Sequence, residues 1–187
     1  MKIFFIDQKE KLFKHLEQLK SSAVMNYEKK RLKEKITSIE IERNFDELNF
    51  EVLFSYKIFP KNIMVYSTQW EEEKRVMKIG DTIVQQAYLP PIMKFSQKVI
   101  FGVRINEVID EPDRKGFSYE TLDGHVEKGV STFTIERNNN ISIFKIHTFS
   151  IPGNILTKLI GPLFSVPYQT FCTKMGLKNV KNQIEKE

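Results

Sequence analysis

The sequence predicts an α+β fold in which an antiparallel sheet is covered by a long C-terminal helix. Two patterns predict it. Apolar and polar residues alternate over most of residues 82–149, as in half-buried strands, and the connections between these runs are short. After Pro152-Gly153 the apolar residues recur at helical spacing instead. Because sequential strands with short connections are typical of an antiparallel meander, their apolar face needs a cover, which the last helix can supply.

Residues 1–43 are predicted to form an N-terminal helical extension packed on a main domain of residues 44–187. A helix is expected over about 8–22, because leucines recur there at helical spacing and Asp7 with Glu10 resembles a capping box. The basic stretch 26–35 is expected to be a solvated helix or connector. A phosphate-binding or membrane-surface patch is the alternative for this stretch.

The next elements follow from local patterns. A first strand is expected at 36–41. Residues 45–59 fit both a strand and a helix, and their length favours the helix, which Pro60 would end. Five further strands are expected, at 82–89, 99–109, 116–122, 132–137 and 141–149, with a tight hairpin at Asn138-Asn139-Asn140.

The final helix is predicted from an apolar stripe. Two features, Gly161-Pro162 and Pro167, are expected to kink or segment it. The polar tail 178–187 is expected to fray. The stripe consists of Leu156, Leu159, Ile160, Leu163, Phe164, Phe171, Cys172 and Met175.

Composition bounds the class of protein. With 187 residues, 41% hydrophobic and 28% charged, the chain can bury a core without disulfides or metals, which excludes a disulfide scaffold and a wholly disordered chain. The single Cys172 and the lack of a secretion signal predict a cytoplasmic protein. The most apolar stretch, 155–166, is too short and too interrupted to predict a transmembrane segment. The net charge is +5, but acidic residues interrupt every basic cluster, which argues against a specific nucleic-acid surface.

Familiar catalytic and cofactor motifs are missing. The chain has no P-loop, no G-x-G-x-x-G, no G-x-S-x-G and no H-E-x-x-H, so no cofactor is predicted. His15, His125 and His147 are too scattered to predict a metal site. Cys172 lies in the apolar stripe and is expected to be an inert, buried thiol. Arg104 falls on the more polar face of its strand and is expected to be a surface charge.

The densest chemistry lies in residues 116–129, which read GFSYETLDGHVEKG. This run resembles the signature of uncharacterised protein family 0548, a bacterial and plant domain of unknown function with a G-F-x-Y-x-T-L strand and a G-H-x-E-x-G loop. The similarity extends from about Phe45 to Leu177 and leaves the preceding residues unexplained. Two charged residues usual in the family are replaced here, by Val130 and Ile151, which weakens the case for a shared reaction.

The resemblance implies a helix-grip, START-like fold, in which a curved antiparallel sheet wraps a long C-terminal helix around an apolar cavity. Such a cavity would bind a small, largely apolar or amphipathic ligand; an ordinary filled core is the alternative. The candidate ligand-binding residues are Phe117, Tyr119, Thr121, His125 and Glu127.

Three other interpretations stay open. In the first, Asp123-Gly124 makes a tight turn, His125 caps a backbone group and Glu127 faces solvent. In the second, the protein is an enzyme of cyclase or hydratase type, with His125 as the base and Glu127 as its orienter. In the third, it is a non-catalytic interaction protein that uses the basic segment 29–35. The sequence determines neither the ligand nor the oligomeric state.

Overall fold

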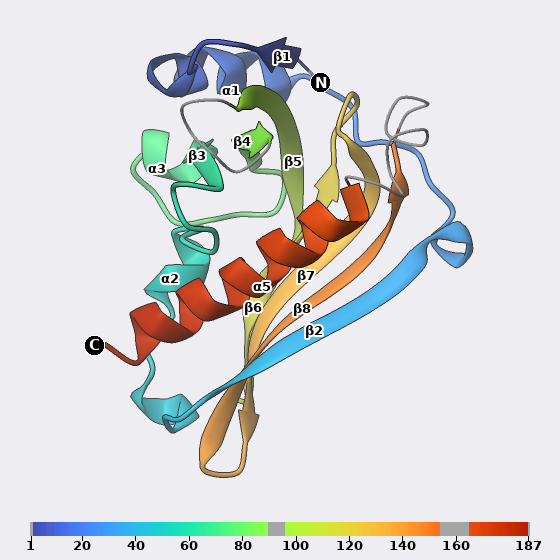
Figure 1. The fold of residues 1–187 in the computed structure, drawn as a ribbon. Coiled ribbons are helices and arrows are strands. Elements are labelled where there is room, and N and C mark those ends of the chain that lie inside the picture. The colour runs from blue at the N-terminus through green and yellow to red at the C-terminus, as the bar shows by residue number, and fades with distance from the viewer. Residues whose placement is uncertain (1, 90–95, 154–164, 187) are drawn as a thin grey trace.

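The sheet and the C-terminal helix dominate the computed structural model, which describes residues 2–89, 96–153 and 165–186. Helix α5 (Ser165–Ile184) lies across one face of a large sheet whose long strands bend (Figure 1). The predicted α+β class, with a curved antiparallel sheet, a C-terminal helix and an N-terminal helix, is confirmed. The first half of the predicted helical stripe, with Gly161-Pro162, lies outside the described residues.

The sheet has eight strands, all paired antiparallel, in the order β2-β8-β7-β6-β5-β4-β3. The short strand β1 joins β5 beyond the point where β6 ends, pairing Lys2 with Ile100. Each strand after β3 pairs with the next along the chain, as expected for a meander. The strands are β1 (Lys2–Phe4), β2 (Lys33–Ile41), β3 (Met64–Thr68), β4 (Thr82–Leu89), β5 (Gln97–Asp110), β6 (Arg114–Thr121), β7 (Glu127–Asn138) and β8 (Ile141–Pro152).

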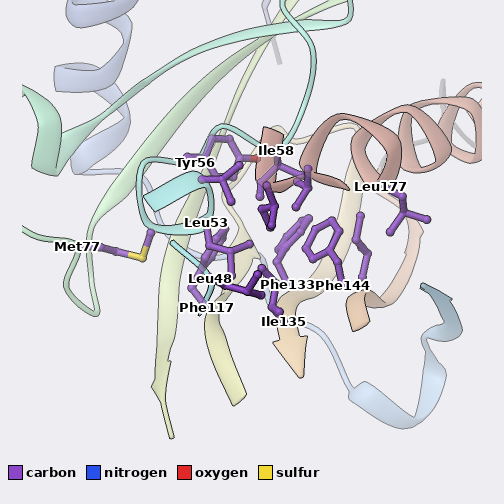
Figure 2. Close-up of a cluster of buried hydrophobic side chains, with 14 of the residues drawn as sticks. Leu48, Leu53, Tyr56, Ile58, Met77, Phe117, Phe133, Ile135, Phe144 and Leu177 are labelled. Carbon is purple, nitrogen blue, oxygen red and sulfur yellow. The ribbon is translucent and has the colours of Figure 1, made fainter. Parts of the chain in front are cut away.

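Alternation along the strands divides the core between two faces. On the inner face, which α5 covers, Phe117, Phe133 and Phe144 pack with Leu177 of the helix (Figure 2). On the outer face, Val84 and Ile100 pack under α1 (Leu12–Lys20). Adjacent residues such as Ile83 and Val84 belong to opposite faces because successive side chains of a strand point to opposite sides. Strands β4 and β5 therefore have buried apolar side chains on both faces of the sheet.

Polar side chains anchor helix α1 at both ends. The Asp7 carboxylate accepts a hydrogen bond from the Lys9 backbone N–H at 2.9 Å, at the start of the 3-10 turn (Lys9–Lys11) that leads into α1, as a capping residue does. It also accepts hydrogen bonds from Gln86 Nε2 and from Tyr88 Oη, both at 3.0 Å, which ties the N-terminal segment to β4. The interpretation of Arg104 as a surface charge is wrong. Its guanidinium donates to the carbonyl oxygens of Leu19, Lys20 and Ser22, so it caps the C-terminal end of α1.

The helix predicted over 45–59 is wrong in extent. The structure has a 3-10 turn, η3 (Phe45–Glu47), and a single turn of helix, α2 (Glu51–Phe54). Helix α2 stops because Tyr56 adopts a left-handed backbone conformation, with φ of 55°. This turn buries the Tyr56 ring in the inner core (Figure 2). The apolar residues that fit both periodicities are thus used in short, irregular segments.

The remaining differences are missing short elements and displaced ends. Strands β1 and β3 and the short helix α3 (Gln69–Glu72) were not predicted. Helix α5 continues through the tail expected to fray, because Val180 and Ile184 are fully buried in the inner core. Pro167 lies in the first turn of α5, where a proline disturbs no helical hydrogen bond. The basic stretch holds a short 3-10 turn, η2 (Lys29–Arg31), before β2.

The N-terminal segment shares the sheet with the rest of the chain. Strand β2 pairs along its whole length with β8, from Lys33 opposite Ser150 to Ile41 opposite Ser142. The boundary between residues 43 and 44 stays a prediction about domain organisation. Within the described ranges, no helix is long and apolar enough to cross a membrane.

Candidate functional site

The candidate residues lie where β6 turns into β7 on the inner face. Phe117, Tyr119 and Thr121 alternate along β6, and His125 and Glu127 follow at the turn and at the start of β7. Phe117 is fully buried and stacks on Phe133, with ring centroids 5.2 Å apart. It therefore belongs to the packed core, and the partly accessible part of this face starts at Tyr119, which is half-buried.

A row of polar side chains crosses the inner face at the level of Tyr119. The strand register places Tyr119 opposite Ser131, Ser131 opposite Thr148, and Thr148 opposite Lys35. The hydroxyls of Ser131 and Thr148 are 3.1 Å apart, within hydrogen-bond distance. We call Tyr119, Ser131, Thr148 and Lys35 the inner-face row. The next row on the same face lies two residues closer to the β7–β8 hairpin. It consists of Phe117, Phe133 and Ile146, which are all buried.

The Tyr119 hydroxyl belongs to a buried network. The side chains of Tyr56, Gln85 and Ser131 interact with it and oppose the effect of burial on its pKa, and Gln85 Nε2 donates to Tyr56 Oη. Burial raises the pKa of the Tyr119 hydroxyl to about 12, so it stays protonated at neutral pH. Tyr119 can therefore donate or accept a hydrogen bond, but it carries no charge.

Thr121 has a structural role. Its hydroxyl accepts a hydrogen bond from Gly129 N at 3.0 Å and lies 3.3 Å from Gly129 O, which fastens the end of β6 to the start of β7. Gly129 has a φ of 152°, and a Cβ added there would lie 1.9 Å from the carbonyl oxygen of Phe149. Gly129, the last glycine of the G-H-x-E-x-G loop, is thus required because a side chain at this position would clash with the backbone of β8.

His125 also supports the turn. Asp123-Gly124 forms the tight turn, with a φ of 81° at Gly124. His125 Nδ1 accepts a hydrogen bond from the backbone N–H of Glu127 at 2.9 Å, and the ring lies 4.4 Å from the Phe101 ring. Burial lowers the pKa of His125 to about 3, which makes the imidazole a weak base at neutral pH. The ring therefore caps the backbone of Glu127 and does not meet its carboxylate.

The Glu127 carboxyl lies on the inner face near the inner-face row. Burial raises its pKa to about 7, while a hydrogen bond from Ser150 and the charge of Lys35 act in the opposite direction. Among the described residues no cation lies within ion-pair distance of it. Lys35 Nζ instead donates to Thr170 Oγ1 of α5 at 3.0 Å. A carboxyl that is close to half-protonated near pH 7 can both donate and accept a hydrogen bond.

This arrangement suits recognition of a polar group better than catalysis. It supplies neutral hydroxyls and one carboxyl with a raised pKa, but its histidine is bonded to the backbone. No group of three His, Cys, Asp or Glu side chains that could hold a metal occurs in the described part of the chain. The sequence alone did not indicate Ser131, Thr148, Ser150 and Lys35 as site residues. Their alternation on β7, β8 and β2 was readable, but the register that aligns them was not.

The chain was also compared with known proteins. The family described as a domain of unknown function, DUF1990, matches residues 21–178. The chain belongs to this family. The match begins earlier than Phe45, so β2 lies within the DUF1990 region and the resemblance drawn from Phe45 onward was too short. Strand β1 and helix α1 precede the DUF1990 region.

Two individual proteins resemble this DUF1990 member. A UPF0548 protein of Deinococcus radiodurans is 38% identical over 61 residues, which are 32% of this chain and 31% of that relative. The chain thus matches about a third of the length of this relative. A crystal structure of a protein from Chromobacterium violaceum is 14% identical, with a TM-score of 0.47 over 81% of this chain and 96% of that one. The comparisons therefore show a family of unknown function.

Proposed function

We propose that this protein binds a small, largely apolar molecule against the inner face of the sheet, with the polar end of the molecule at Tyr119 and Glu127. One observation carries the proposal. The apolar row of Phe117, Phe133 and Ile146 is buried, whereas the polar row beside it, with Tyr119, Ser131 and Thr148, is half-buried. A partly accessible polar row beside a buried apolar row offers the polar and the apolar contacts that an amphipathic molecule needs.

The polar end of the ligand would be neutral. Tyr119 is uncharged at neutral pH, and burial has raised the pKa of the Glu127 carboxyl to about 7. A ligand hydroxyl or carbonyl can exchange hydrogen bonds with both groups without bringing a charge into a buried place, which would be costly. Alcohols and carbonyl compounds therefore fit better than strong acids. Thr121 and His125 support this proposal by fixing the turn that presents Glu127.

Native mass spectrometry of the purified protein, followed by solvent extraction, tests the proposal. We expect a bound molecule of small mass that the extraction releases. Ser131→Phe should fill the inner-face row and abolish that adduct. Ser38→Phe is the matched control, because Ser38 is exposed on β2 and is predicted to leave the adduct unchanged. A folded wild-type protein without any adduct, which also fails to enhance the fluorescence of 1-anilinonaphthalene-8-sulfonate, would contradict the proposal.

A further inference from the structure

A hollow lies on the outer face of the sheet, so its lining is separate from the inner-face row. Its volume is about 280 Å³, and it lies between the sheet and the segment that leads into β2. The Tyr27 hydroxyl donates to Glu120 Oε1 of β6, which fastens this segment over the strands. We call it the outer hollow; it is large enough for a small organic molecule.

The floor of the outer hollow is a straight row across four strands. The register places Glu107 of β5 opposite Ser118, Ser118 opposite Thr132, and Thr132 opposite His147 of β8. The hydroxyls of Ser118 and Thr132 lie 3.2 Å apart, in the middle of the row. Three strand intervals separate its ends, which corresponds to about 14 Å between Cα atoms. The two ends are therefore far enough apart to recognise different groups of one molecule.

The β8 end of the hollow holds an ammonium group. Lys29 Nζ lies 4.4 Å from the centroid of the Phe149 ring, and the His147 ring packs on the same phenylalanine at 4.6 Å. His147 Nε2 lies 2.7 Å from the Glu34 carboxylate, so that carboxylate is already engaged with the imidazole. The neighbours of Lys29 have an anionic partner, because Lys30 and Arg31 both lie within ion-pair distance of Glu28. Among the residues described, no carboxylate pairs with Lys29. The basic segment singled out in the sequence thus places one unpaired ammonium group at the hollow.

The β5 end is anionic. Strand β5 has a bulge between Ile105 and Glu107, and the Glu107 side chain lines the hollow. Within the described ranges its carboxylate has neither an ion-pair partner nor a hydrogen-bond donor. Glu107 and Lys29 are both exposed to solvent, so a dissolved molecule can reach them. They do not pair with each other, although they line the same hollow.

We propose that the outer hollow binds a small zwitterion, with the carboxylate at Lys29 and the ammonium group at Glu107. The Ser118 and Thr132 side chains, whose hydroxyls bond to each other, line the floor between the two ends. Two unpaired charges of opposite sign, held at opposite ends of one hollow, favour a ligand that satisfies both. A ligand with a single charge pairs with one end and leaves the other unpaired. Charge-assisted hydrogen bonds at both ends therefore provide the selectivity.

Three probes of matched length test this inference: 6-aminohexanoate, hexanoate and hexylamine. Titrations followed by amide NMR of the intact protein should show shifts at Ser118, Thr132 and His147 with 6-aminohexanoate, at an affinity at least about tenfold higher than for either singly charged probe. Equal affinity for the three probes, or no shift at these residues, would overturn the proposal.

Substitutions assign the two ends. Lys29→Gln and Glu107→Gln should each weaken 6-aminohexanoate binding about tenfold. Lys30→Gln is the matched control and should leave the affinity unchanged, since Lys30 is exposed and paired with Glu28. If Lys30→Gln lost as much affinity for 6-aminohexanoate as Lys29→Gln, the binding would depend on the overall surface charge and the proposed site would be rejected. Ser131→Phe on the inner face should not alter this binding, which separates this result from the test of the proposed function.

Discussion

His125 Nδ1 accepts a hydrogen bond from the backbone N–H of Glu127, so the two residues meet through the main chain and not through their functional groups. The imidazole holds the turn between β6 and β7 in place. The carboxyl of Glu127 is left on the inner face, where burial raises its pKa to about 7. The G-H-x-E-x-G loop therefore presents one titratable group and uses the other to fix its own backbone.

His125→Ala should destabilise the protein by about 2 kcal/mol, because it leaves a buried N–H without its acceptor and removes the contact with Phe101. Urea unfolding followed by circular dichroism measures the loss. His15→Ala serves as a comparison, since the Nε2 of that buried histidine has no hydrogen-bond partner. A His125→Ala protein as stable as the wild type would show that the turn does not depend on the ring.

His125 should also make the fold sensitive to acid. Its pKa is about 3 in the folded state against about 6.5 in an unfolded chain. The unfolded state therefore binds more protons between these values, so the contribution of His125 is complete above about pH 6.5 and is lost as the pH falls toward 3. The free energy of unfolding of wild type and His125→Asn, compared from pH 7 to pH 4, should converge on the acid side. Parallel curves would contradict the assignment.

Glu127 should produce the opposite pH dependence. Its pKa is raised to about 7 in the folded state, against a value near 4.5 when unfolded. The folded state holds the proton more tightly, so stability falls as the pH rises from about 4.5 through 7. Glu127→Gln cannot ionise and should lose this dependence, becoming more stable than the wild type above pH 7. Glu47→Gln, at an exposed position, should keep the wild-type profile.

Arg104→Met should loosen α1. The substitution leaves the carbonyl oxygens of Leu19, Lys20 and Ser22 without their shared donor, at a cost of about 2 kcal/mol. Hydrogen exchange should speed up in α1 more than in β7 and β8. Arg114→Met removes only an exposed ion pair with Glu111 and should change stability by less than about 1 kcal/mol. Uniform exchange throughout the protein would argue against a local role for Arg104.

Phe117→Ala should cost about 3–5 kcal/mol, because the ring is fully buried and stacked on Phe133. Thermal unfolding measures this cost. Phe171→Ala is the control, since Phe171 is 42% exposed and contributes little to the core. If Phe117→Ala unfolds at the wild-type temperature, the inner face near Phe117 is less tightly packed than the structure shows.

The sequence by itself determined the elements whose pattern is local. Alternation located the strands from 82 to 149, the three asparagines located the β7–β8 hairpin, and helical spacing located α1 and the last helix. Residues 45–59 fitted both the strand and the helix periodicity, and choosing between them by length led to the wrong prediction of one long helix. The left-handed turn at Tyr56 depends on packing against residues distant in the sequence.

The tertiary structure alone decided which side chains meet. The sequence places Tyr119, Ser131, Thr148 and Lys35 on four separate strands, and only the register of non-local backbone hydrogen bonds brings them into one row. The same holds for Glu107 and Lys29 at the outer hollow, and for Arg104 at the end of α1. Alternation fixes which residues of a strand share a face, whereas the alignment between strands depends on closing the whole sheet.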